Sequence, residues 1–405
     1  MNEAWNDFTH EHGPGIQGRR EILKSAAAVF AAPMLAGVAE GAQSPQHASA
    51  AAKGPFPARA YGVAGAKAPF APMRIERRAL RPNDVLIDIL YCGICHSDIH
   101  IARGEWGTSR FPCVPGHEII GRVQAVGSSV TKFKAGDMAG VGCIIDSCGV
   151  CENCQADLEQ YCVKGWTLVF NTPDRVSGGL NFGGYSDKLV VAEHYGIRIP
   201  PGADLAATAP LLCAGITTFS PLQHWKVGAN QRVGVAGLGG LGHLAVKLAV
   251  ARGADVTVFT TSPGKVDDAR RLGARAAVQW GDAEAMKRLE NQLDLIISTV
   301  PKGYSIQPFV NLLKVDGTFV NVGALDDLEP LSGRALISRR RNVAGSVIGG
   351  IAETQQVIDY CAARNIKADI ELIRPDQISQ AYDRVVNKDV RYRFVIDMSS
   401  SKEAA

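Results

Sequence analysis

A glycine-rich turn with the spacing G-x-G-x-x-G, at residues 237–242, constrains the fold of this chain more than any other feature. An apolar stretch precedes the turn, and a helix-forming stretch at residues 244–250 follows it. In such a unit the first glycine permits the tight turn, the second lets a pyrophosphate approach the backbone, and the third allows close helix–strand packing. The free N–H groups at the start of the helix favour phosphate. We therefore predict a dinucleotide site at Gly237, Gly239, Gly240, Leu241 and Gly242.

The residues around this turn alternate between short apolar strands and helical stretches. We expect strands at residues 232–236, 255–260, 293–299 and 317–322. Such alternation is typical of a doubly wound parallel sheet. The fold class is therefore α/β, with a nucleotide-binding domain at residues 204–345.

The preceding residues have a different pattern, in which short strands are separated by glycine-rich turns. Strands are expected at residues 85–90, 119–126 and 185–191, which predicts a β-rich domain over residues 51–203. Two helices and a closing strand at residues 392–396 are expected after Ser346. We assign residues 346–405 to a return of the chain to the β-rich domain.

The segment after the second expected strand indicates which cofactor binds. Enzymes that use NAD place an acidic residue about 20 residues past the glycines, where it binds the ribose 2′-hydroxyl. This chain has Thr261 at that position, between Thr260 and Ser262, and Lys265 follows. A carboxylate would repel a 2′-phosphate, whereas hydroxyls and a lysine would bind it, so we predict NADP(H). An ordinary loop with a solvated lysine is the alternative.

Two groups of residues are suited to binding metal. The first has the spacing C-x2-C-x2-C-x7-C, and four thiolates so spaced can bind one tetrahedral zinc ion. Two disulfides are the alternative in an exported protein, although cysteines three apart in a tight loop suit a metal better. The members of this group are Cys148, Cys151, Cys154 and Cys162.

The second group is dispersed along the chain, and spacing alone does not join its members. It consists of Cys95, the pair His117 and Glu118, and Cys213. Two thiolates and one imidazole leave a fourth coordination position open, as a catalytic zinc ion requires.

Together with these groups, the motifs at residues 93–100, 104–107, 115–118, 183–186 and 212–215 resemble the zinc-containing medium-chain dehydrogenase/reductase superfamily. Within it, residues 55–398 are most similar to NADPH-dependent aldehyde reductases of the cinnamyl-alcohol-dehydrogenase type. The resemblance implies a GroES-like catalytic domain, a Rossmann coenzyme domain, and catalytic zinc bound by Cys95, His117 and Cys213. It also implies that Glu118 lies near the metal and can exchange with its water. With a structural zinc ion, two zinc ions per subunit are expected, and we expect a homodimer.

The resemblance also assigns roles in hydride transfer with a small aldehyde or primary alcohol. Ser97 lies two residues after Cys95 and matches a hydroxyl that passes a proton through the nicotinamide ribose to a histidine, here His100. Trp106 is expected to line a cleft for hydrophobic or aromatic substrates. The alternatives are that His100 is an ordinary surface histidine and that Trp106 is a packing residue. His96 either lies near the pyrophosphate or forms a hydrogen bond to a loop. A non-catalytic zinc- or nucleotide-binding protein remains the alternative function, although no expected ligand or relay hydroxyl is missing.

The first 50 residues differ from the rest of the chain. Arg19 and Arg20 precede an apolar, alanine-rich stretch at residues 25–38, and Ala48-Ser49-Ala50 forms an A-x-A site. These parts predict a secretory signal of the twin-arginine type, and hence the export machinery as a partner and a periplasmic location. Cleavage is expected after Ala50, with Ala42 as a second possibility. The alternative is a disordered tail with a chance arginine pair, in which case the protein stays in the cytoplasm.

Composition excludes two classes of partner. The formal net charge is +3, and no lysine–arginine cluster with interleaved aromatic residues occurs, so we expect no nucleic-acid partner. No apolar run reaches the roughly 18–20 residues that a bilayer-spanning helix needs, so no membrane span is expected.

Overall fold

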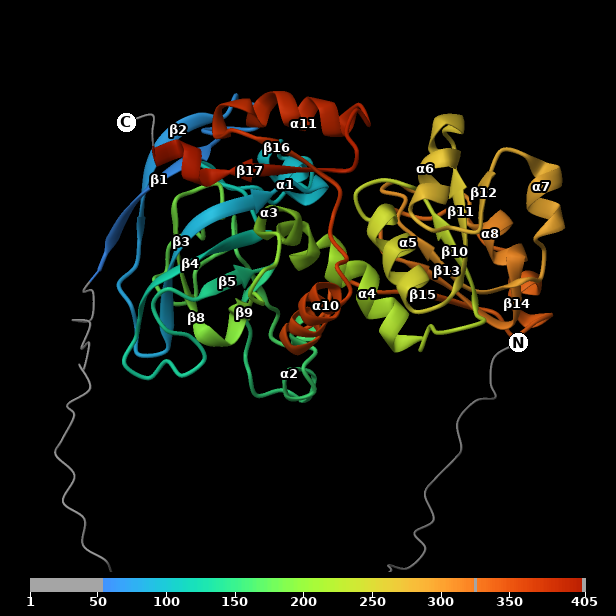
Figure 1. Cartoon of the computed structure of the whole chain (residues 1–405), viewed down its shortest axis with the longest axis horizontal. Helices are drawn as coiled ribbons and strands as arrows, with labels where there is room; N and C mark the ends of the chain where they lie inside the picture. The colour runs from blue at the N-terminus through green and yellow to red at the C-terminus, as the bar shows by residue number, and fades with distance from the viewer. Residues whose placement is uncertain (1–53, 324–325, 403–405) are drawn as a thin grey trace, which may run out of the picture. The chain divides into compact units, whose positions relative to one another are not determined.

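The computed structural model describes residues 54–323 and 326–402 (Figure 1). The expected export signal, with Arg19, Arg20 and both cleavage sites, lies outside the described residues. Two large sheets organise the described part of the chain, one parallel with six strands and one mixed with seven.

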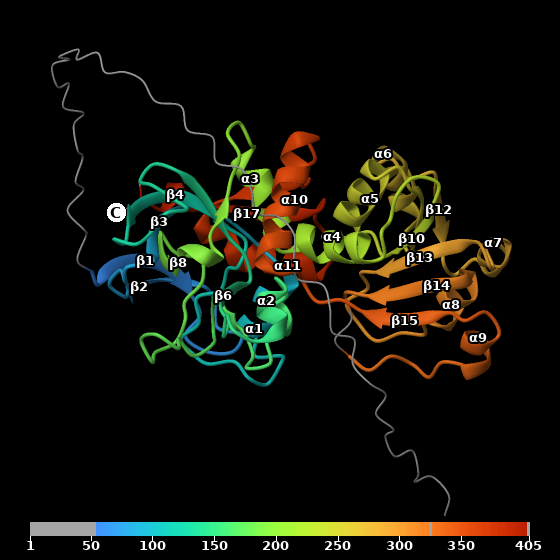
Figure 2. The same cartoon turned by 90° about the horizontal axis from the view of Figure 1, so that it is seen from below.

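Figure 2 shows the strands of the six-stranded sheet, which the glycine-rich turn adjoins. All its strands are parallel, in the order β12-β11-β10-β13-β14-β15. Their bounds are β10 Arg232–Ala236, β11 Asp255–Thr260, β12 Ala276–Gln279, β13 Leu293–Ser298, β14 Leu313–Asn321 and β15 Asn342–Gly345. The order reverses between β10 and β13, which is where sheets of this kind bind ligands at the carboxyl ends of their strands. The turn at residues 237–242 directly follows β10 and so lies at this reversal.

The doubly wound sheet predicted from the sequence is confirmed, and it has two further strands that were not predicted. The four expected strands correspond to β10, β11, β13 and β14, and the last begins four residues earlier than expected. Strands β12 and β15 are at the two edges, are short, and have mostly half-buried or exposed residues. Each has only four residues and is not buried on both faces, so its sequence signal is shorter than that of the interior strands.

Helices connect the parallel strands and cover the sheet. Apolar residues of α5 pack on one side, and a second apolar cluster around Phe259, Phe309 and Phe319 fills the other. The bounds are α5 Gly242–Ala251, α6 Val266–Arg271, α7 Ala283–Arg288, α8 Gln307–Leu312 and α9 Gly333–Ile337.

The seven-stranded sheet has the order β16-β17-β3-β4-β5-β9, and β8 also pairs with β3. The bounds are β3 Asp84–Gly93, β4 Ile119–Val126, β5 Met138–Val141, β8 Lys188–Ala192, β9 Ile197–Arg198, β16 Ile370–Ile373 and β17 Arg393–Asp397. Strand β8 begins three residues later than expected, because Tyr185 is buried and its backbone binds Tyr61 and Pro115 instead. Strand β17 pairs antiparallel with β3, so the end of the chain joins the sheet that contains the first strands.

The remaining elements pack around this sheet (Figure 1). Two hairpins lie beside it, β1 Phe56–Gly62 with β2 Ala71–Arg77, and β6 Ile144–Asp146 with β7 Thr167–Leu168. The helices are α1 His96–Ala102, α2 Glu152–Gln155, α3 Leu205–Thr208, α4 Ala214–His224, α10 Ile351–Ala363 and α11 Ile378–Val386. Helix α4 contacts both α5 and α10, so residues 205–224 connect the two sheets.

Within the described ranges, no single helix is long and apolar enough to cross a membrane. One pair, Leu205–Leu212 and Ala214–His224, meets that criterion together by length and composition but is bent by 56°. Residues 209–222 of this pair are buried in the protein, which accounts for their apolar character.

Candidate functional site

Four buried side chains from distant parts of the chain meet beside the start of α1. Cys95 precedes α1, His117 and Glu118 precede β4, and Cys213 precedes α4. One donor atom from each lies within 4.8 Å of the others. The Cys95 and Cys213 Sγ atoms are 4.0 Å apart, and His117 Nε2 lies 3.3 Å from Cys213 Sγ. Two sulfur atoms bound to one tetrahedral zinc ion are about 3.8 Å apart, so Cys95, His117 and Cys213 fit a zinc ion as ligands.

Asp98, in the first turn of α1, fixes two of these side chains. Its carboxylate is fully buried and accepts hydrogen bonds from His117 Nδ1 and from the Cys95 and Gly116 backbone N–H groups, each at 2.9 Å. The bond to Nδ1 leaves Nε2 of His117 directed at the cysteines with a lone pair available. No role for Asp98 is predicted from its motif, although its position three residues after Cys95 suits a side chain that caps α1.

Glu118 forms a buried ion pair with Arg393 of β17, a residue that sequence reasoning missed. Burial raises the pKa of Glu118 to about 7, and the Arg393 charge opposes this rise. Glu118 Oε1 accepts from Arg393, whereas no hydrogen-bond partner reaches the buried Oε2 from the described residues. A Cβ on Gly93 would lie 1.9 Å from this Oε2, so the position requires glycine. An orphaned carboxylate oxygen beside two thiols and an imidazole again fits a cation.

The predicted proton relay and substrate residues lie along α1 and the turn after it. Ser97 Oγ is 3.9 Å from Cys95 Sγ. His100 Nδ1 bonds to Glu105 Oε2 at 2.5 Å, and the His100 ring stacks on Trp106 with centroids 5.1 Å apart. In the described part of the chain, no direct hydrogen bond joins Ser97 to His100. Glu105, which the sequence analysis did not single out, fixes the orientation of the His100 ring.

The other two residues considered in this region are accessible. The His96 side chain is exposed, and its ring centroid lies 6.1 Å from that of His100. The Trp106 side chain is also exposed, with a relative accessibility of 39%. Because Trp106 stacks on His100, it lies beside the solvent-exposed histidine of the predicted proton relay.

The four closely spaced cysteines, Cys148, Cys151, Cys154 and Cys162, meet in a separate lobe between β6 and β7. One thiol from each lies within 4.8 Å of the others, and Cys148 Sγ is 3.9 Å from Cys154 Sγ. Backbone N–H groups of Cys154 and Val163 lower the pKa of Cys151 to about 6, which favours the thiolate. All the cysteines that the structure describes are free thiols. Four converging thiols fit one tetrahedral metal ion, and the disulfide alternative has no support in this geometry.

Glu159 joins the cysteine lobe to α10. Its buried carboxylate accepts a hydrogen bond from the Ile351 N–H at the start of α10, at 3.0 Å, and another from His194 Nε2, also at 3.0 Å. A carboxylate at a helix N-terminus satisfies a free N–H group and stabilises the helix dipole. The lobe therefore supports the helix that follows the six-stranded sheet.

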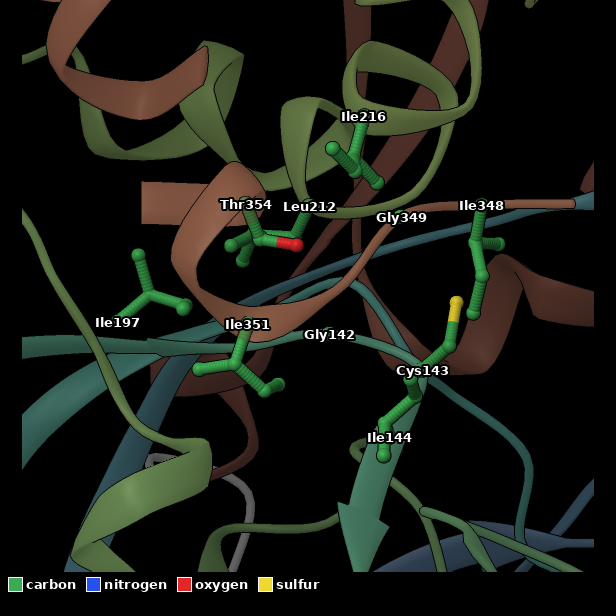
Figure 3. Close-up of a pocket in the computed structure, with 10 residues that line it drawn as sticks. All are labelled: Gly142, Cys143, Ile144, Ile197, Leu212, Ile216, Ile348, Gly349, Ile351 and Thr354. Atoms are coloured by element: carbon green, nitrogen blue, oxygen red, sulfur yellow. The ribbon is translucent and has the colours of Figure 1, made fainter. Parts of the chain in front are cut away.

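A small apolar cavity lies where the end of β5 meets α4 and α10 (Figure 3). Its lining is apolar except for the Cys143 thiol and the Thr354 hydroxyl, so it offers no charged group to a ligand. A hydrogen bond with Cys213 is the main factor that lowers the pKa of Cys143, for which no role is predicted from the sequence. The lining residues are Gly142, Cys143, Ile144, Ile197, Leu212, Ile216, Ile348, Gly349, Ile351 and Thr354.

The glycine-rich turn has the geometry that its spacing predicts. Gly237 has a φ of 91°, and a Cβ on Gly242 would lie 2.1 Å from the Gly237 carbonyl oxygen. A Cβ on Gly239 would meet no heavy atom within 4 Å, so a ligand can approach the backbone there. Leu241 is the residue that precedes the first turn of α5. Arg393 packs against Gly240, with its Cδ 2.8 Å from where a Cβ would stand. The same arginine therefore contacts both Glu118 and this turn.

The residues predicted to select the cofactor lie at the carboxyl end of β11. The Thr260 side chain is buried and its Oγ1 accepts from the Ser262 N–H at 3.1 Å, whereas Thr261 is exposed. Lys265 Nζ donates to the Leu238 carbonyl at 2.8 Å, which brings its charge to the glycine-rich turn. No carboxylate accompanies these residues at the end of β11.

Two family models match the chain. The model described as the alcohol dehydrogenase GroES-like domain matches residues 81–201, and the one described as zinc-binding dehydrogenase matches residues 240–363. Among curated relatives, NADP-dependent alcohol dehydrogenase C 1 of Mycolicibacterium smegmatis is 50% identical over 342 residues, covering 84% of this chain and 98% of the relative. Aldehyde reductase YahK of Escherichia coli is 51% identical over 343 residues, covering 84% and 97%.

Solved structures agree with this similarity. A cinnamyl alcohol dehydrogenase from Sorghum bicolor is 43% identical with a TM-score of 0.81, covering 85% of this chain and 98% of its own. The cinnamyl alcohol dehydrogenase of Helicobacter pylori, solved with NADP(H), is 41% identical with a TM-score of 0.78, covering 85% and 99%.

Proposed function

Because the chain belongs to the zinc-binding alcohol dehydrogenases, with a GroES-like domain and a Rossmann-type domain, we propose that it transfers a hydride between NADP(H) and a small aldehyde or primary alcohol. The observation that carries the proposal is the buried group of Cys95, His117, Glu118 and Cys213, joined through Arg393 to the glycine-rich turn. Relatives of about 50% identity are named alcohol dehydrogenases and aldehyde reductases, which favours a catalytic over a non-catalytic protein.

The chain is proposed to bind two zinc ions, since it has two separate groups of donor atoms. Cys95, His117 and Cys213 would hold the catalytic ion, with Glu118 beside it, and Cys148, Cys151, Cys154 and Cys162 would hold a structural one. The chemistry that a catalytic zinc ion supplies when bound is Lewis-acid polarisation of the substrate oxygen. Asp98 holds His117 in the tautomer that offers Nε2 to the ion.

In the proposed reduction, the chain's own residues supply the proton. The Ser97 hydroxyl, two residues after Cys95, gives a proton to the alkoxide that forms on the substrate, and His100 exchanges it with solvent. The His100 side chain is about one-third exposed, which suits exchange, and Glu105 holds its ring in place.

The proposed cofactor preference and substrate class rest on particular side chains. Thr261, Ser262 and Lys265 offer hydroxyls and a positive charge to a 2′-phosphate, and no carboxylate there would repel it. Trp106 presents an exposed aromatic face beside His100, which favours hydrophobic or aromatic aldehydes.

The proposed assembly is a homodimer. Strand β15 is at the edge of the six-stranded sheet, and Val343 on it, Val347 after it and Ile337 before it are exposed. An exposed edge strand with apolar side chains is suited to pairing with another chain. Light scattering on the purified protein would test this, since a monomer at micromolar concentration contradicts it.

Export to the periplasm by the twin-arginine route is proposed from the arginine pair, the apolar stretch and the A-x-A site within residues 1–50. This route carries folded proteins, so zinc and cofactor would be acquired before export.

The proposed activity is tested with purified protein and a panel of aliphatic and aromatic aldehydes, with NADPH or NADH as reductant. We expect oxidation of NADPH with at least one hydrophobic aldehyde, and zinc analysis near two ions per chain. A zinc-loaded protein that turns over no aldehyde or alcohol with either cofactor would contradict the proposal.

A further inference from the structure

The segment between α11 and β17 lies across the glycine-rich turn. The Tyr392 ring stacks on that of His243, with centroids 4.8 Å apart and planes 11° apart. Arg393 packs against Gly240, and Tyr392 N–H donates to the Asp369 carbonyl at 3.0 Å. These contacts fix Tyr392 and Arg393 beside the first turn of α5, and Arg391 directly precedes them.

Arg391 extends from this segment to helix α6. Its Nη2 lies 3.1 Å from Asp268 Oδ2, and Arg271 pairs with the other oxygen of the same carboxylate. Asp268 is buried and lies three residues after Lys265, so the two residues share one face at the start of α6. The Arg391 guanidinium therefore lies against a residue of α6 that is one helical turn after Lys265.

The positive charge around Lys265 exceeds the negative charge that could balance it. Burial lowers the pKa of Lys265, and the charges of Lys388 and Arg391 lower it further. Across the described residues, neither Lys265 nor Lys388 pairs with a carboxylate, and Asp268 is already shared between two arginines. Such an excess of charge beside exposed hydroxyls is expected where an anionic group binds.

We infer that Lys388 and Arg391 bind the 2′-phosphate of NADP(H) together with Lys265, so that residues from both sheets select the cofactor. The inference deepens the proposed function and rests on it. Lys265 approaches the phosphate from the loop after β11, whereas Lys388 and Arg391 approach it from the segment before β17. Cofactors that lack the 2′-phosphate make no use of these two side chains.

The test measures binding of 2′,5′-ADP, which has the phosphate, and of 5′-AMP, which lacks it, by calorimetry on the zinc-loaded protein. Lys388 has a φ of 59°, so Lys388→Asn removes the charge with a residue that tolerates this conformation. Arg391→Gln removes the second charge, while Arg391→Lys retains it. The KM values for NADPH and NADH are measured on the same variants.

Two matched controls separate loss of these charges from loss of any surface charge. Lys226→Asn changes another exposed lysine with positive φ, 51°, at the end of α4. Arg374→Gln removes another exposed arginine that pairs with an aspartate, since Arg374 Nη2 lies 2.9 Å from Asp376. Among the described residues, neither Lys226 nor Arg374 forms a hydrogen bond or an ion pair with the glycine-rich turn.

We expect Lys388→Asn and Arg391→Gln each to weaken 2′,5′-ADP binding about tenfold, as loss of one partly exposed charge-assisted contact to phosphate. Binding of 5′-AMP should change less than about twofold, Arg391→Lys should retain most of the affinity, and the controls should match the wild type. Unchanged 2′,5′-ADP binding in both variants would overturn the inference, as would equal losses for both ligands. A wild type that binds 2′,5′-ADP no better than 5′-AMP would instead overturn the NADP preference and the inference with it.

Discussion

Replacement of Asp98 by asparagine is expected to weaken zinc binding at the catalytic site without dismantling it. The carboxylate accepts three hydrogen bonds of 2.9 Å, from His117 Nδ1 and from the Cys95 and Gly116 N–H groups. An asparagine amide can keep two of these if its oxygen replaces the Oδ1 that His117 and Gly116 share. Its NH2 group then faces the Cys95 N–H, and a buried donor without an acceptor costs about 1–3 kcal/mol of stability.

The remaining bond to His117 also becomes weaker, because a neutral amide oxygen replaces a charged one. Loss of such an outer partner of a metal-binding histidine typically reduces metal affinity about 10- to 100-fold. Zinc content is measured as a competing chelator is added, together with the free energy of unfolding in denaturant. We expect Asp98→Asn to lose one zinc ion at a chelator concentration about 10- to 100-fold lower than the wild type, while the cysteine lobe keeps its ion.

Asp84→Asn is the matched control. Asp84 is also fully buried and pairs with Arg78 and Arg81 at the start of β3, away from both groups of metal-binding residues. Both variants should be less stable than the wild type, but only Asp98→Asn should lose zinc more easily. Equal zinc affinity in the two variants would refute the assignment of Asp98 as the residue that positions His117.

Further outcomes follow from the same geometry. Thr261→Asp should shift the ratio of kcat/KM for NADPH and NADH toward NADH by about 100-fold or more, through repulsion of the 2′-phosphate; a wild type that already prefers NADH would contradict this. Cys154→Ser should remove one zinc ion and lower the melting temperature, because the lobe also supports α10; four paired cysteines in the wild type would exclude a structural zinc. Ser97→Ala should lower kcat about 10²- to 10⁴-fold with zinc content and NADPH binding unchanged, and an unchanged kcat with hydride transfer rate-limiting would exclude the relay. Arg19→Lys combined with Arg20→Lys should retain a fused reporter in the cytoplasm, whereas continued export would exclude a twin-arginine signal.

The sequence predicts those parts of the fold that depend on local pattern. The four interior strands of the parallel sheet contain short apolar runs, and the glycine-rich turn follows one of them, so both can be predicted before the structure is known. Strands β12 and β15 were missed because edge strands have only one neighbour and need no such run. Spacing in the sequence also brings the four cysteines of the lobe together, since they span only 15 residues, from 148 to 162.

Contacts between distant residues could not be predicted in this way. Asp98 acts on His117, 19 residues later, and its own motif does not indicate that partner. Arg393 pairs with Glu118 across 275 residues, and only the position of β17 in the sheet brings them together. Glu105 is closer in sequence to His100, but their contact depends on how the chain turns after α1.

The pairing of β17 with β3 explains why the metal-binding residues and the glycine-rich turn lie together. Val395 pairs with Gly93, and the Ile94 N–H donates to the Phe394 carbonyl at 2.9 Å, so the ladder continues to the residue before Cys95. The same register places Arg393, at the start of β17, against Glu118 on one side and Gly240 on the other. A shift of β17 by one residue would direct the Arg393 side chain to the opposite face of the sheet. The register of this single strand pair therefore determines whether an arginine is available to join the two sites.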